Sequence, residues 1–174
     1  MTIENYEQHV AKGLAGPGTS TCHPSAFDCV SDRHSVSTDT YTAFNDFFES
    51  PDPNQPTYRE LQRRLYRELG CSSLRGVSYK SVRDAEGFAD LLGRYRQGGR
   101  RVGIWTGPDH LVGLRPATTG ETCRLVGLVP PDTPDEPMLP EDIFYEYLEI
   151  DRRRGGDNWD NVMSISAEPR ERFA

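Results

Sequence analysis

Gly103-Ile104-Trp105-Thr106-Gly107-Pro108-Asp109-His110-Leu111-Val112-Gly113-Leu114 joins two apolar runs through a short turn sequence. The runs, 101–106 and 111–114, have the length and the Val, Ile and Trp content of strands that are buried on both faces. Between them, glycine permits positive φ, proline presets φ, and aspartate can bond its own backbone. The stretch therefore predicts a β-hairpin, with His110 at the junction between the turn and the second strand.

Helical patterns dominate the chain before this hairpin, and strand patterns follow it. Thr57-Tyr58-Arg59-Glu60 is a capping box, in which the threonine bonds forward and the glutamate reaches back to start a helix. Apolar spacing predicts helices over about 2–14, from 22 onward, and over about 41–48, 57–69, 81–97 and 140–148, with further strands at 123–129 and 162–167. This order predicts the α+β class, with N-terminal helices packed on a C-terminal antiparallel sheet. We expect one domain over 1–174, with a helical half of about 1–98, a β-rich half of about 99–168 and a frayed tail at 169–174.

Composition narrows the possible classes of protein. The chain has 174 residues, a formal net charge of −7 and four cysteines. An acidic balance argues against a nucleic-acid-binding protein, and so few cysteines argue against a disulfide scaffold. No apolar segment resembles a cleavable signal or a membrane span. We therefore expect a protein without a membrane or nucleic-acid partner, either cytoplasmic or delivered into a host cell without a cleavable signal.

Cys22 and His110 are the two residues whose chemistry most clearly suits catalysis. Pro24 suits the first turn of a helix, which places Cys22 at or just before a helix N-terminus. A helix N-terminus and a nearby imidazolium both lower a thiol pKa, and the imidazole can take and return the proton. The pair predicts a nucleophilic thiol. The simpler interpretations are a small buried thiol and a histidine that bonds the turn.

These two fragments resemble the papain-like cysteine proteases, in particular the compact viral leader-protease and bacterial-effector types. Cys22-His23-Pro24-Ser25-Ala26-Phe27 is similar to the family's cysteine helix, and 107–114 is similar to its histidine strand. The resemblance covers about 20–30 and 100–132. It implies a papain-like fold, hydrolysis of a protein or peptide substrate, and no cofactor. Here His23 replaces the aromatic residue that commonly follows the nucleophile, and no Gln or Asn shortly before Cys22 offers an oxyanion donor.

The resemblance also implies a third residue that orients the histidine. Its place on or after the following strand indicates Asp132, with Glu121 and Asn158 as alternatives. A deamidase or an acyl transferase uses the same fold and the same first step, thiolate attack on a carbonyl carbon. The sequence does not choose between these activities and proteolysis.

Other interpretations remain open at this point. Cys22, His23, Cys29 and His34 offer zinc ligand types but lack the usual spacing. Cys71 is a second candidate nucleophile, disfavoured by its place after a helix C-terminus. Arg59, Arg63 and Arg67 line one side of a helix, as a solvated face or an anion site. A small acidic binding, immunity or inhibitor protein is the non-enzymatic alternative.

Overall fold

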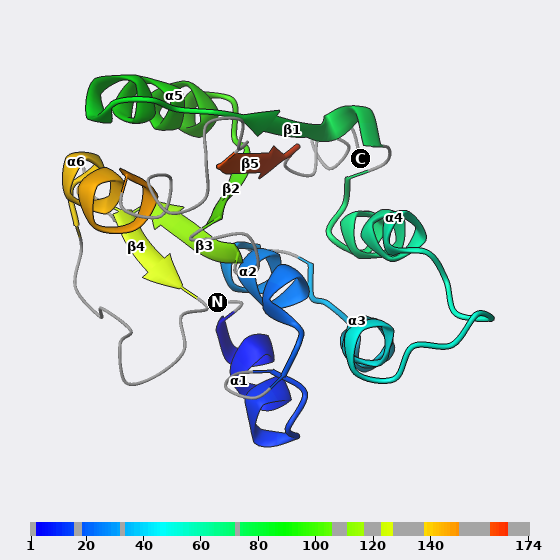
Figure 1. The fold of residues 1–174 in the computed structure, drawn as a ribbon. Helices are drawn as coiled ribbons and strands as arrows, with labels where there is room; N and C mark the ends of the chain where they lie inside the picture. Colours follow the sequence, from blue (N-terminus) through cyan, green and yellow to red (C-terminus); the bar gives the residue numbers. More distant parts are fainter. Residues whose placement is uncertain are drawn as a thin grey trace, which may run out of the picture.

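The computed structural model describes eight segments of the chain: 3–15, 19–31, 34–71, 74–105, 111–116, 123–126, 138–149 and 161–166. The helices are α1 (Ile3–Ala11), α2 (Cys22–Val30), α3 (Thr38–Glu49), α4 (Tyr58–Glu68), α5 (Ala85–Gln97) and α6 (Pro140–Ile143), with a short 3-10 helix η1 (Leu74–Gly76) and a π-helix η2 (Phe144–Glu149) that follows α6. The strands are β1 (Val77–Lys80), β2 (Arg101–Trp105), β3 (Leu111–Pro116), β4 (Cys123–Val126) and β5 (Val162–Ile165). Figure 1 shows helices and strands in one body.

The strands of the described segments form one sheet in the order β1-β5-β2-β3-β4. Every neighbouring pair is antiparallel, and the predicted hairpin pairs Trp105 with Leu111 and Val102 with Leu114. The last strand of the sequence, β5, lies between β1 and β2. The α+β class is therefore confirmed, with helices packed on an antiparallel sheet.

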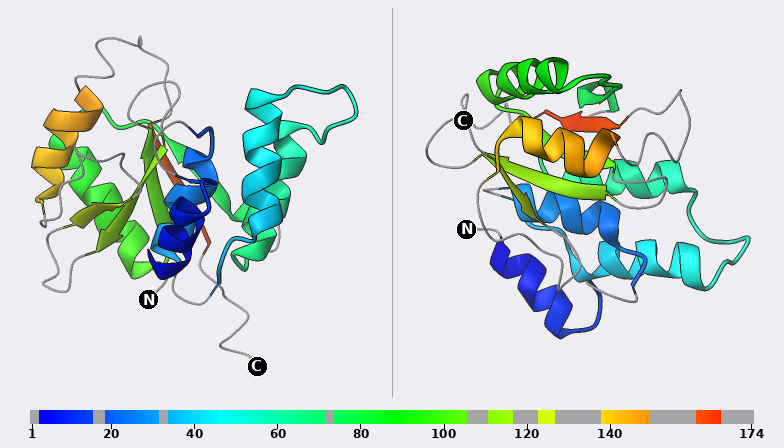
Figure 2. Two further views of the ribbon diagram at one scale, coloured as in Figure 1. Left: turned by 90° about the horizontal axis from the view of Figure 1, so that it is seen from below. Right: turned by 60° about the vertical axis from the view of Figure 1, so that its left-hand side comes forward.

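Helices cover both faces of the sheet, as the left view of Figure 2 shows. On one face, α2 packs against β2 and β3, and α1 and α3 contact its outer side. On the other face, α5 and η2 enclose a second cluster with Val102, Ile104 and Val112. The alternation of side chains along each strand separates these two cores, because neighbouring residues point to opposite faces.

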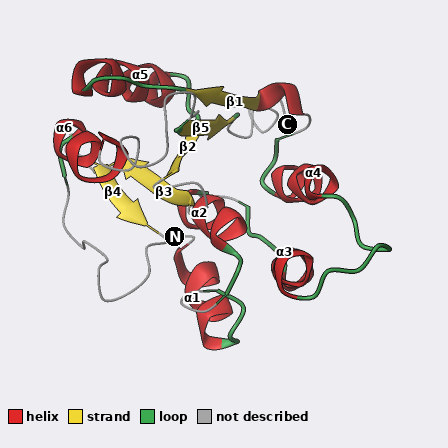
Figure 3. Cartoon of the chain, in the orientation of Figure 1, coloured by secondary structure: helices red, strands yellow, loops and turns green. Residues whose placement is uncertain are grey.

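Local capping signals fix the starts of α4 and α5. The capping box at Thr57 and Glu60 is present in full, as the sequence predicts. The helix expected from residue 81 begins instead at Ala85, and Asp84 caps it by accepting from the N–H of Gly87. The polar loop between α3 and α4 returns the chain so that these two helices lie side by side (Figure 3). Together they form the outer wall of the helical layer.

Two expectations about elements need correction. The expected helical half contains β1, which joins the edge of the sheet by pairing with β5. In the helix expected over about 2–14, the spacing of Ile3, Tyr6 and Val10 predicts one apolar face. In α1, however, the Val10 side chain is 39% exposed, and His9 is buried at 3% exposure. His9 is buried because it stacks on Tyr41 of α3, a contact that the local spacing does not encode.

Candidate functional site

Cys22 is the first residue of α2, as the sequence predicts. The preceding Thr21 makes no side-chain cap, and its hydroxyl donates to the carbonyl of Leu14 at 2.7 Å. The first turn of α2 carries no acidic residue. Cys22 is half-buried, whereas the next eight residues of the helix are buried. The thiol therefore lies at the positive end of a helix dipole and near the surface, a setting that lowers a thiol pKa.

The first turn of α2 lies beside the end of the hairpin. The ring of His23 is 5.9 Å from that of Trp105 and nearly perpendicular to it. Trp105 ends β2 and is paired with Leu111, the first residue of β3. His110 directly precedes Leu111 in the sequence but lies outside the described residues, as do Asp132, Glu121 and Asn158.

Two glycines allow α2 to lie close to these strands. Gly103 of β2 and Gly113 of β3 are paired in register, on the face that carries Leu111 and Trp105. A Cβ atom at Gly103 would come within 3.2 Å of Leu111 Cδ1 and 3.3 Å of the Val112 carbonyl oxygen. The space beside Gly103 is therefore occupied by β3, the strand against which α2 packs.

His23 is held in a cage of aromatic rings. Its Nδ1 lies 2.6 Å from the Tyr58 hydroxyl, and its Nε2 lies 2.6 Å from the Tyr66 hydroxyl. Phe27, Phe44 and Trp105 complete the enclosure. Burial lowers the pKa of His23 to about 3, so the ring is neutral at physiological pH. His23 therefore ties the start of α2 to α4 and does not serve as a base for Cys22.

Asp28 organises a second buried polar group, further along α2. Its carboxylate accepts hydrogen bonds from Asn5 Nδ2, from the Tyr41 hydroxyl at 2.7 Å and from the backbone N–H of Val36 at 3.1 Å. His9 Nδ1 lies 4.0 Å from the carboxylate. Burial raises the pKa of Asp28, although these hydrogen bonds oppose the shift. The group joins α1, α2 and α3 in the middle of the helical layer.

The described residues give no support to the zinc interpretation. Within the described segments, no group of three or more His, Cys, Asp or Glu residues is arranged to hold a metal ion. Both ring nitrogens of His23 already face tyrosine hydroxyls. Cys29 is fully buried in the apolar core. The four residues therefore do not converge on a common point.

Cys71, the second candidate nucleophile, is buried at 3% exposure. It follows α4, and its sulfur lies next to Gly76. A Cβ atom added to Gly76 would come within 2.8 Å of Cys71 Sγ. It borders a cavity of about 340 Å³ that is also lined by Arg59, Arg63, Tyr66, Arg67, Leu74 and Arg75. The predicted arginine row therefore lies on the wall of a cavity.

Comparison with known proteins gives no relative: no protein-family model, curated protein or solved structure matches the chain. Among the described helices, none has the length and apolar character needed to cross a bilayer. The functional argument therefore depends on the geometry around Cys22.

The site also contains residues that the sequence analysis missed. Tyr58 and Tyr66 fall there within the predicted helix over about 57–69 and have no assigned role, yet their hydroxyls hold His23. Asp28 and His9 have no assigned role there. The available signal is the presence of Cys, His, Ser and Asp in a helix that is otherwise apolar, because buried polar groups need partners. That signal indicates a network but does not name the partners.

Proposed function

We propose that the chain is a thiol hydrolase of the papain-like type that acts on a protein or peptide. In this proposal Cys22 is the nucleophile, His110 is the general base and acid, and Asp132 orients the imidazole. The observation that supports it most directly is the packing of the first turn of α2 beside Trp105, the residue paired with Leu111. His110 directly precedes Leu111 in the sequence.

The other histidines support this assignment by their positions. His23 is neutral and bonded through both ring nitrogens. His9 lies against Asp28 and Tyr41, in the middle of the helical layer. His34 follows the far end of α2, about 12 Å along the helix from Cys22. His110 is the fourth histidine of the sequence, and it directly precedes Leu111, the residue paired with Trp105.

The reaction follows from these roles. His110 takes the thiol proton, and the Cys22 thiolate attacks the carbonyl carbon of the substrate amide. The tetrahedral intermediate collapses as His110 protonates the leaving amine, which leaves a thioester on Cys22. Water then attacks the thioester, His110 takes a proton from that water, and the acid product leaves with the thiol restored. Glu121 and Asn158 are the alternatives to Asp132 as the residue that orients the imidazole.

A cleavage experiment tests the proposal. The purified chain is incubated with a denatured protein mixture, and new peptide N-termini are identified by mass spectrometry. We expect cleavage by the wild type and by Cys71→Ala, and a loss of about a thousandfold or more in Cys22→Ala and His110→Ala. Cleavage that persists in Cys22→Ala would overturn the proposal. The same spectra detect conversion of Gln to Glu, which would indicate a deamidase with the same dyad.

A further inference from the structure

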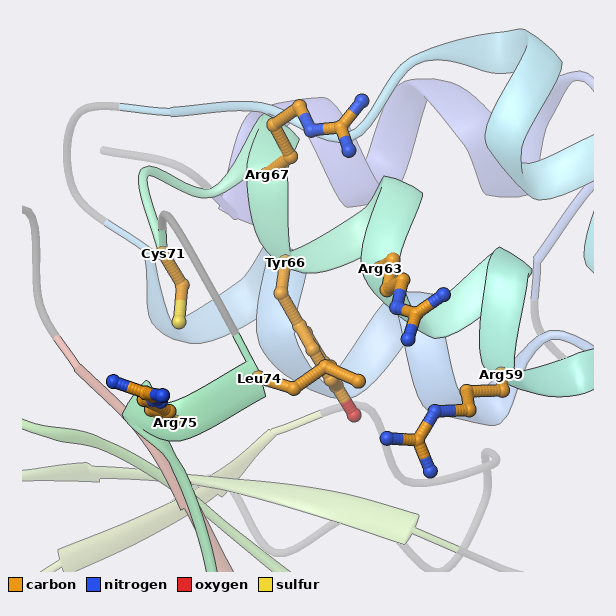
Figure 4. Close-up of a pocket in the computed structure, with 7 residues that line it drawn as sticks. All are labelled: Arg59, Arg63, Tyr66, Arg67, Cys71, Leu74 and Arg75. Carbon is orange, nitrogen blue, oxygen red and sulfur yellow. The ribbon is translucent and has the colours of Figure 1, made fainter.

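The cavity between α4 and η1 has four arginines on its wall. Arg59, Arg63 and Arg67 come from successive turns of α4, and Arg75 comes from η1. Figure 4 shows the side chains of Arg59 and Arg63 close to each other beside α4, and the guanidinium groups of Arg67 and Arg75 farther away. All four arginines are exposed to solvent. This concentration of positive charge stands out in a chain with a net charge of −7.

The charges of this arginine group are not balanced by the rest of the described chain. Within the described segments, none of the four arginines forms an ion pair. The two glutamates of α4 have other roles: Glu60 accepts from the backbone N–H of Thr57, and Glu68 accepts from Ser37 and Thr40. Arginines at i, i+4 and i+8 repel one another and reduce the stability of an isolated helix. An anion bound along the row would offset this repulsion.

The dimensions of the cavity indicate the kind of anion. The row from Arg59 to Arg67 extends about 12 Å along the helix, which is too long for a single anionic group. Two phosphate monoesters carry a charge of about −3 to −4, which matches four guanidinium groups. The volume of about 340 Å³ is at the small end of ligand sites. Four carboxylates on a peptide would need more space than this.

We propose that this cavity binds a small organic molecule with two or more phosphate groups. Arg59 and Arg63 bind the phosphate oxygens through paired N–H donors, and Arg67 and Arg75 add positive charge at the rim. Tyr66 and Leu74 contact the organic part of the ligand. The site does not depend on the thiol chemistry proposed for Cys22. Tyr66 nevertheless connects the two regions, because its hydroxyl bonds His23 Nε2.

Titration calorimetry with inorganic pyrophosphate and with ADP, in about 0.15 M salt without magnesium, tests the site. We expect both probes to bind, with ADP tighter because it adds an organic part. The double variant Arg59→Gln/Arg63→Gln should weaken both by at least about tenfold, the effect of losing charge-assisted hydrogen bonds. Arg64→Gln is the matched control, since Arg64 is an exposed arginine of the same helix that does not line the cavity. It should change affinity by less than about twofold.

Several results would overturn the proposal. These are no heat of binding with either phosphate probe, equal weakening by Arg64→Gln and by the double variant Arg59→Gln/Arg63→Gln, or binding of a tetraglutamate peptide as tight as that of ADP. Urea unfolding of the unliganded double variant gives a second measurement. We expect a midpoint equal to or above that of the wild type, because like charges have been removed. A lower midpoint would show that the arginines support the fold instead of a ligand.

Discussion

His23 shows how one residue connects a candidate nucleophile to the rest of the fold. It follows Cys22 directly, and its ring is fixed by two tyrosine hydroxyls of α4. In a neutral imidazole one nitrogen donates and the other accepts, so one tyrosine must accept and the other must donate. Protonation would leave two N–H donors and a buried charge, which the aromatic cage does not offset. His23 therefore stabilises the fold only while it is neutral.

The buried state of His23 predicts a loss of stability in acid. Its pKa is about 3 in the folded protein against an ordinary 6.5, so the unfolded chain binds more protons between these values. The contribution of His23 to the free energy of unfolding is then full above about pH 6.5 and falls as the pH is lowered toward 3. Between pH 7 and pH 5 the loss from this residue is about 2 kcal/mol, measured by urea unfolding.

Two variants isolate this contribution. His23→Phe removes the titrating group, so its free energy of unfolding should change less between the two pH values than that of the wild type. Phe27→Leu perturbs the neighbouring ring and keeps the histidine, so it should be destabilised yet retain the wild-type pH dependence. Equal pH dependence in the wild type and in His23→Phe would contradict this assignment.

The sequence predicted some residues of the site and missed others for a physical reason. Cys22 and the Thr57–Glu60 box were found because helix starts have short-range signals. His23 was considered as a zinc ligand and as a replacement for the aromatic residue after Cys22. Its role in the fold was missed because its partners Tyr58 and Tyr66 are 35 and 43 residues away. A buried polar side chain shows in the sequence that it needs partners, but tertiary packing selects them.

At the scale of elements, the contact of α2 with the β2–β3 hairpin determines the position of Cys22. The paired glycines at 103 and 113 present backbone in place of side chains to the helix. A side chain at Gly103 would meet Leu111 and the carbonyl of Val112. Overpacking of this kind forces neighbouring groups to shift. The geometry around Cys22 therefore depends on a residue that carries no functional group.

Two glycine substitutions should have opposite effects on stability. Gly103→Ala should lower the free energy of unfolding by about 1–3 kcal/mol, because the new methyl crowds β3. Gly93→Ala, in the exposed middle of α5 with nothing within 4 Å of the added Cβ, should raise it by about 0.5–1 kcal/mol. Urea unfolding measures both. A neutral or stabilising effect of Gly103→Ala would show that α2 and β3 have more space than this contact indicates.

The helices and strands with clear hydrophobic patterns in the sequence were predicted. Features that depend on pairing between strands far apart in the sequence were not. The β2–β3 hairpin was predicted because two apolar runs flank a turn, and the structure pairs them in register. β1 was missed because four half-exposed residues at a sheet edge give little pattern. The position of β5 between β1 and β2 also has no local signal, since its partners are brought together only by folding.

At the scale of the molecule, the sheet separates two regions with different roles. One face, with α5 and η2, forms an apolar core. The other face supports α2, and there α1, α3 and α4 surround the helix with aromatic and polar contacts. Both proposed sites lie on this second side: Cys22 at the start of α2, and the arginine-lined cavity beside α4. Tyr66 contributes to both, so occupancy of the cavity can be expected to influence the surroundings of His23.

The most direct measurement of the central claim is the pH dependence of Cys22 alkylation by iodoacetamide, followed by mass spectrometry of the peptide that contains Cys22. The account predicts a thiolate titration well below the ordinary value of about 8.5 in the wild type and in His34→Ala, and an upward shift of about one unit or more in His110→Ala. A midpoint near about 8.5 in all three proteins would contradict the account and favour a non-enzymatic binding protein.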